Sequence, residues 1–128
     1  MVIAQALTTA SIGRHSELLA QTALLAHGYA VLEPIVPEPY DLAVTKRGDN
    51  RIVRVQVKTV IKRLKNGIWY YVVRGKKSNG NVYTKDDCDV FIGVYDSVVW
   101  LLDNREITEY MIRVDEVNEK WTELPTTL

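Results

Sequence analysis

The sequence predicts an α/β (α+β) fold with a mixed central β-sheet flanked by helices. Its first part contains one apolar-striped segment with helix-capping residues, and short β-forming runs separated by turn residues follow. The chain has 128 residues, of which 47% are hydrophobic, so it can bury a sizeable core within one domain. We therefore expect residues 1–128 to form a single domain.

The composition excludes several classes of protein. The single cysteine, Cys88, excludes an internal disulfide framework and a zinc site made of several cysteines. No apolar run approaches the ~18 residues of a membrane span. The N-terminal segment also lacks the basic region of a signal peptide. We expect a soluble cytoplasmic protein with no membrane partner.

Charge is unevenly distributed along the chain, although the formal net charge is zero. Residues 46–85 contain twelve Lys or Arg and one acidic residue, Asp49, a net charge of +11. Residues 86–128 contain eleven acidic and three basic residues, a net charge of −8. This separation favours a basic surface for a polyanion such as DNA, although a basic stretch can also be an ordinary solvated face.

The first expected element is a helix, capped by Thr8 or Ser11 and ended by Gly28. Its apolar residues recur at helical spacing and give it a broad stripe for the core. Glu17 lies beside this stripe, where a carboxylate needs a partner. It either reaches water or Arg14, or it points toward a functional site.

Short strands are expected next, over residues 29–34 and 40–45. Pro34 at the end of the first strand, with Pro37 and Pro39 after it, holds the chain extended and prevents a helix. The turn-forming residues 46–50 then lead into a strand over 51–59, which returns antiparallel to the strand before it.

The second half of the chain is expected to be mainly strands and loops. Residues 61–67 are predicted to be a basic connection that leads to a β-forming run at 68–74. The longest loop, residues 75–88, is basic and contains glycines, so it either closes over a ligand or is a plain hairpin tip. Its Tyr83 either contacts DNA or packs. The remaining elements are a hairpin of 89–95 and 98–102, an edge strand at 110–114 and a helical turn at 115–120.

The strand over residues 51–59 has an informative alternation of side chains. Three valines at 53, 55 and 57 fall on one face, whereas Arg54, Gln56 and Lys58 fall on the other. A polar face between apolar runs needs a polar neighbour. Asp41, fifteen residues before Gln56, lies in the partner strand, and the hairpin brings it close.

Asp41, Gln56 and Lys58 therefore form a candidate site for cleaving phosphodiester bonds, a reaction that a divalent metal assists. The Asp41 carboxylate, the Gln56 side-chain oxygen and the Val57 backbone carbonyl are hard ligands of the kind that Mg²⁺ prefers. Lys58 can bind the phosphate, orient the attacking water or transfer a proton if burial lowers its pKa. The alternative is a polar strand face open to water, with Asp41 in an ion pair.

The sequence resembles the PD-(D/E)XK nuclease superfamily. The resemblance is carried by a helix with Glu17, followed by GYAVLEP, YDLAV and RVQVKT. It extends over about residues 12–115 and is closest to the small endonucleases of group I introns, because IWYYVVR, YTKDDCDVFIGVY and VVWLLDNREI follow in the same order. The segment GRHSELLAQTALLAHGYAV more distantly resembles archaeal-type Holliday-junction resolvases.

The resemblance implies a restriction-endonuclease-like core and a catalytic set of Glu17, Asp41, Gln56 and Lys58. Glu17 matches the helix glutamate, and Asp41 matches the metal-binding aspartate, although a tyrosine replaces the usual proline before it. Gln56 stands where most members carry an acid, and Lys58 matches the motif lysine. The intron branch resembles this chain in its Gln-x-Lys motif. The implied cofactor is Mg²⁺, with Mn²⁺ able to substitute.

We predict a metal-dependent, site-specific DNA endonuclease of the homing type, in the cytoplasm of a bacterial or phage-infected cell. Cutting both strands requires two sites, so we expect a homodimer or homotetramer on double-stranded or branched DNA. Two alternatives stay open: a Holliday-junction resolvase, and a catalytically inactive DNA-binding or assembly module in which Gln56 marks a lost site. The basic residues expected to bind DNA are Arg14, Arg54, Lys62, Arg63, Lys65, Arg74, Lys76, Lys77 and Lys85.

Overall fold

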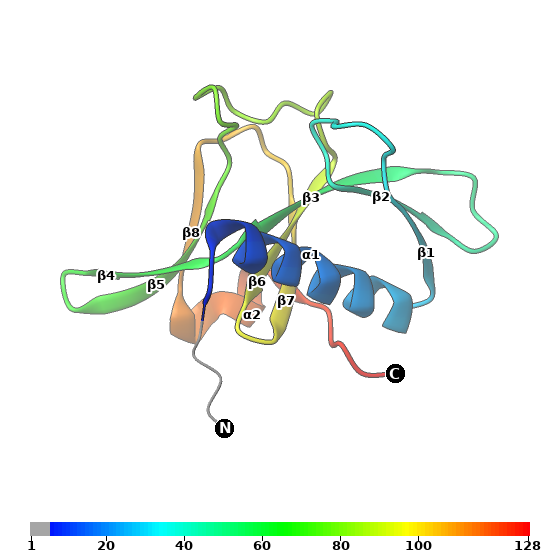
Figure 1. Ribbon diagram of the computed structural model, residues 1–128. Helices are drawn as coiled ribbons and strands as arrows, with labels where there is room; N and C mark the ends of the chain where they lie inside the picture. Colours follow the sequence, from blue (N-terminus) through cyan, green and yellow to red (C-terminus); the bar gives the residue numbers. More distant parts are fainter. Residues whose placement is uncertain (1–5) are drawn as a thin grey trace.

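The computed structural model describes residues 6–128, so the first five residues of the expected 1–128 domain lie outside the described residues. It contains a six-stranded sheet and a three-stranded sheet (Figure 1). The strands of the larger sheet lie in the order β1 (Tyr29–Leu32), β2 (Leu42–Lys46), β3 (Val53–Thr59), β6 (Val90–Tyr95), β7 (Val98–Asp103) and β9 (Thr122–Glu123). Those of the smaller sheet lie in the order β4 (Ile61–Lys65), β5 (Ile68–Arg74) and β8 (Glu109–Arg113). Only β3 and β6 pair in parallel in the larger sheet. This arrangement confirms the predicted mixed sheet.

Helix α1 (Thr9–Ala26) lies across one face of the larger sheet (Figure 1). It begins as predicted, because the Thr8 side chain accepts a hydrogen bond from the Ser11 N–H at 3.0 Å. The chain leaves the helix through Gly28, whose φ of 83° favours glycine. The buried positions of α1 are small or apolar and pack on the valine face of β3.

The hairpin of β2 (Leu42–Lys46) and β3 (Val53–Thr59) confirms the predicted antiparallel pair, with Leu42 opposite Val55. Strand β1 (Tyr29–Leu32) pairs on the outer side of β2. The larger sheet is completed by β6 (Val90–Tyr95), β7 (Val98–Asp103) and the two-residue β9 (Thr122–Glu123). The 3-10 turn η1 (Val114–Glu116) and the short helix α2 (Val117–Lys120) precede β9.

The prediction that residues 61–67 are a connection is wrong. Ile61–Lys65 forms strand β4, which pairs with β5 (Ile68–Arg74), and β8 (Glu109–Arg113) adds to the other edge. Asn66 and Gly67 both have positive φ, 52° and 78°, as a tight two-residue hairpin turn requires. β4 has no buried side chain, so its sequence lacks the apolar alternation of a half-buried strand.

A second core separates the two sheets. It includes Phe91 and Trp100 from the larger sheet and Val73 and Tyr110 from the smaller one. Trp121 packs on Trp100, with ring centroids 6.0 Å apart. The larger sheet therefore has α1 on one face and this aromatic core on the other. Within residues 6–128, no helix combines the length and apolar character that crossing a bilayer requires.

Candidate active site

Asp41 lies immediately before β2, where its side chain reaches the neighbouring strand β3. Its N–H donates to the Val55 carbonyl at 2.9 Å. Its carboxylate accepts a hydrogen bond from the Val57 N–H at 2.9 Å. This second bond fixes the half-buried carboxylate against the part of β3 that carries Gln56 and Lys58. The hairpin thus brings Asp41 to this strand segment, as the sequence predicts.

The backbone of Val57 adds a possible ligand at the same place. In a strand, the N–H and C=O of one residue point to the same side. Because the Val57 N–H points to Asp41, its carbonyl lies on the Asp41 side too. Val57 packs its side chain with α1, whereas Gln56 is half-buried on the opposite face of β3. The segment of β3 that meets Asp41 therefore carries a backbone carbonyl, that of Val57, and an amide side chain, that of Gln56.

Burial has the largest influence on the pKa of Asp41. Removal from water raises the pKa of this carboxyl above its usual range, against the hydrogen bond from Val57. The charge of Glu17 raises this pKa further, and that of Lys58 lowers it. Among residues 6–128, this carboxylate makes no ion pair. A bound cation would supply a partner of opposite charge.

Lys58 lies on β3, on the face of the strand that is turned away from α1. Its Nζ donates to the backbone carbonyl of Lys76 at 3.4 Å and lies 4.8 Å from the centre of the Tyr83 ring. Burial lowers the pKa of Lys58, and the charge of Asp41 opposes this shift. Among residues 6–128, Lys58 has no ion-pair partner.

Glu17 makes the contact with Arg14 that one of its two expected roles requires, and its charge also acts on Asp41. Its carboxylate pairs with Arg14 at 2.9 Å, and Arg14 also contacts Glu33 at 3.1 Å. The side chain is 29% exposed, and its charge still reaches Asp41. Glu17 thus lies at the margin of the site, tied to a surface ion pair.

The donor set suits a hard divalent cation. Magnesium takes few protein oxygens and keeps several waters, so one carboxylate with two neutral oxygens is compatible with it. Within the described chain, no three His, Cys, Asp or Glu side chains gather closely enough to hold a metal. A metal at Asp41 would therefore depend on the neutral oxygens of Gln56 and Val57.

Several of the basic residues expected to bind DNA are engaged in contacts within the protein. Arg63 makes a two-pronged contact with Glu109, at 2.9 and 3.1 Å. Lys77 pairs with Asp87 at 2.9 Å, and Lys62 lies 5.0 Å from the centre of the Trp69 ring. Five of the expected residues have no ion pair in the part of the chain that the structure describes: Lys62, Lys65, Arg74, Lys76 and Lys85.

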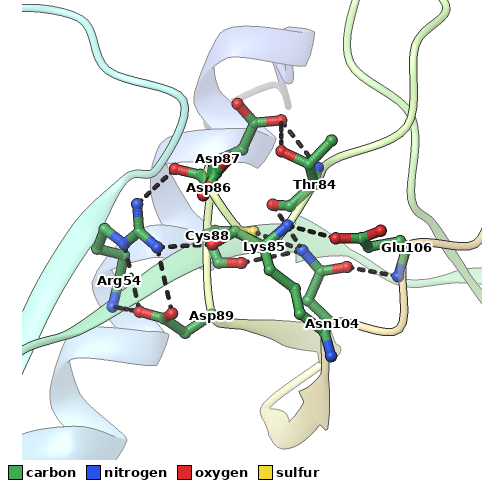
Figure 2. Close-up of polar contacts among 9 residues, drawn as sticks. All are labelled: Arg54, Thr84, Lys85, Asp86, Asp87, Cys88, Asp89, Asn104 and Glu106. Carbon is green, nitrogen blue, oxygen red and sulfur yellow. Dashed lines mark hydrogen bonds and ion pairs between the residues drawn. The ribbon is translucent and has the colours of Figure 1, made fainter.

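Arg54 joins β3 to the loop before β6 (Figure 2). Its guanidinium contacts the Asp89 carboxylate at 3.2 Å, the Lys85 carbonyl at 2.6 Å and the Asp86 carbonyl. Its backbone N–H also donates to Asp89 at 2.8 Å. These contacts give Arg54 a structural role that its place in a basic stretch does not reveal.

We expect Arg54→Ala to leave the salt dependence of DNA binding unchanged and to lower stability by about 1–2 kcal/mol, because it removes several charge-assisted hydrogen bonds. The unpaired Lys65 provides the matched control. If Lys65 contacts a phosphate, Lys65→Ala reduces the slope of log K against log salt by about 0.9. Binding titrations at several salt concentrations measure both slopes. A reduced slope for Arg54→Ala would show that Arg54 contacts DNA.

The chain resembles known proteins in both sequence and structure. A sequence profile of a family described as PD-(D/E)XK endonuclease matches residues 7–122. The structure resembles that of a bacterial homing endonuclease, I-Ssp6803I, with a TM-score of 0.63 and 20% sequence identity. The match covers 82% of this chain and 75% of that one, and it confirms the restriction-endonuclease-like core. No curated protein matches the chain.

Proposed function

This chain belongs to the PD-(D/E)XK endonuclease family, and from that premise we propose that it hydrolyses DNA at the Asp41 site with Mg²⁺, for which Mn²⁺ can substitute. The strongest support is the 2.9 Å hydrogen bond between the Val57 N–H and the Asp41 carboxylate. It brings the acid to the strand that carries Gln56 and Lys58. A bound metal would supply Lewis-acid activation of water and offset charge on the phosphate.

The proposed roles of the residues follow from their positions. The carboxylate of Asp41, the side-chain oxygen of Gln56 and the backbone carbonyl of Val57 hold the metal. Lys58 presents its Nζ to the scissile phosphate or to the attacking water. Glu17 adds negative charge at the edge of the site.

We further propose that the substrate is double-stranded DNA and that cleavage is site-specific, of the homing type. The likeness to a homing endonuclease structure supports this choice over a junction resolvase. Two copies of the chain are needed to cut two strands, so the active form is a homodimer or homotetramer. The unpaired basic residues described above are the proposed phosphate contacts.

The test is cleavage of a randomised duplex library with Mg²⁺, followed by sequencing of the cut ends. We expect metal-dependent cuts at a shared sequence. A four-way junction and a linear duplex of the same sequence are compared in parallel, because a resolvase cuts only the junction. Tight DNA binding without cleavage in either Mg²⁺ or Mn²⁺ would instead identify an inactive DNA-binding module.

Gln56 offers a direct test of the metal ligands. We expect Gln56→Glu to tighten Mg²⁺ binding roughly tenfold, because a carboxylate attracts the cation more strongly than a neutral amide. Gln56→Ala, which removes the ligand, should weaken binding. Calorimetric titration with Mg²⁺ measures both. Equal affinities for the wild type and both variants would remove Gln56 from the proposed set of ligands.

A further inference from the structure

Tyr83 lies within the loop between β5 and β6, and its ring packs in the core between the two sheets. The loop closes on itself through a bridge between Lys76 and Val82, and the Tyr83 N–H donates to the Gly75 carbonyl at 3.0 Å. Tyr83 is only 8% exposed. Its ring meets Phe91 nearly edge-on, at 85° and 5.5 Å between centroids. The ring therefore cannot turn without disturbing the aromatic core.

One face of this ring lies against the amine of Lys58. The Lys58 Nζ lies 4.8 Å from the ring centroid, within the range in which an aromatic face attracts a cation. The same loop supplies a second contact, the 3.4 Å hydrogen bond from Nζ to the Lys76 carbonyl. Lys58 is thus held by one loop, through a ring face and a backbone oxygen.

The chain on both sides of Tyr83 is fixed. On the C-terminal side, the Thr84 N–H donates to Asp87 at 2.9 Å, and the Thr84 carbonyl accepts from Asn104 at 3.0 Å (Figure 2). On the N-terminal side, a Cβ at Gly75 would collide with the carbonyl oxygen of Ile107. These contacts fix the position of the Tyr83 ring relative to β3.

The charge of Asp41, the other part of the site, also acts on the Tyr83 phenol. Burial raises the pKa of Tyr83 to about 12, and the charge of Asp41 contributes to this shift. The phenol therefore stays neutral at working pH. No ion pair joins Lys58 and Asp41 in the described chain. The contact with the Tyr83 ring thus holds the Lys58 amine in a place where the amine is free of Asp41 and available to a phosphate.

We infer that Tyr83 is a positioning residue of the cleavage site: its ring face holds Lys58 Nζ apart from Asp41, in the place from which it meets the phosphate. The inference rests on the role of Lys58 in the proposed function. It gives a specific role to a loop tyrosine for which the sequence alone predicts either packing or contact with DNA. The group that acts is the ring face, so the hydroxyl is dispensable.

The test compares Tyr83→Phe, which keeps the ring, with Tyr83→Leu, which removes it. We expect Tyr83→Phe to retain kcat within about threefold, and Tyr83→Leu to lose about tenfold in kcat with KM for DNA unchanged. The matched control is Tyr71→Leu, which removes an aromatic residue packed against Tyr95 and Trp100. This control should lower the melting temperature without changing kcat. In a Lys58→Met background, Tyr83→Leu should cost nothing more.

A spectroscopic measurement separates this inference from the proposed function. In proton–carbon-13 correlation spectra, the ε-methylene protons of Lys58 should show an upfield ring-current shift in the wild type and in Tyr83→Phe, and lose it in Tyr83→Leu. This readout needs no cleavage. An unshifted Lys58 in the wild type, or an equal loss of kcat in the Phe and Leu variants, would overturn the inference. A protein that shows the shift but cuts no DNA would instead contradict the proposed function.

Discussion

Asp41→Asn should reduce metal-dependent DNA cleavage by at least about a thousandfold, while the metal-free protein stays no less stable than the wild type. Asp41 supplies the one charged ligand of the proposed metal set, so its loss removes most of the attraction for the cation. The asparagine side chain keeps an oxygen that can accept the Val57 N–H, so the local hydrogen bond survives. Cleavage and stability measured on this variant therefore distinguish a loss of catalytic function from a loss of folding.

The expected stability follows from the direction of the Asp41 pKa shift. Burial raises the pKa of Asp41 in the folded protein. A group of this kind stabilises the fold below its unfolded pKa, and this stabilisation is lost as pH rises through the folded pKa. At neutral pH the folded protein holds a buried carboxylate that the neutral amide replaces at no cost. Thermal unfolding without metal, at neutral pH, should give equal or higher melting temperatures for Asp41→Asn.

The same shift predicts the pH dependence of metal binding. Protons compete with the metal for the Asp41 carboxylate. As pH is lowered, Mg²⁺ affinity should therefore begin to decrease at a higher pH than it would with an aspartate of ordinary pKa. Calorimetric titrations across this pH range measure it. Asp103→Asn, which removes an exposed carboxylate from β7, is the matched control and should bind Mg²⁺ like the wild type. Unchanged Mg²⁺ affinity in Asp41→Asn would place the metal elsewhere.

The parts of the fold that sequence predicts are those specified by local signals. The Thr8 cap and Gly28 delimit α1, and the valine alternation identifies β3. The position of Asp41 follows from these, because the β2–β3 hairpin is local and its register aligns Leu42 with Val55. Side-chain alternation does not reveal strand β4, because its exposed side chains do not alternate with buried ones. The Asn66-Gly67 pair, a strong hairpin signal, could have identified it.

The engaged basic residues could not be predicted, because their partners are distant in the sequence. Arg54 meets Asp89 only because β3 and β6 pair in parallel, 35 residues apart. Arg63 meets Glu109 only because β8 joins the second sheet. The high positive charge of residues 46–85 is therefore partly neutralised by the acidic C-terminal part of the same chain. The contact of Lys58 with Tyr83 likewise depends on the path of a long loop.

Lys58→Met should lower kcat by about 10²–10⁴-fold while DNA affinity and melting temperature stay near those of the wild type. Methionine retains an unbranched apolar side chain against the Tyr83 ring and removes the amine. Burial lowers the pKa of Lys58, which means that the fold disfavours the ammonium form, so its removal should not cost stability. The loss of rate would then report the amine's contribution to the reaction alone.

Lys62→Met is the matched control for this experiment, because Lys62 also rests on an aromatic ring, Trp69, at 5.0 Å. Lys62 lies on β4, in the second sheet, and contacts none of the proposed metal ligands. Its replacement should at most weaken DNA binding and leave kcat unchanged. Single-turnover cleavage at saturating protein separates rate from affinity. If both variants cut DNA at the wild-type rate, or if the defect of Lys58→Met disappears at saturation, Lys58 acts only in binding, and the cleavage site must be sought elsewhere on the chain.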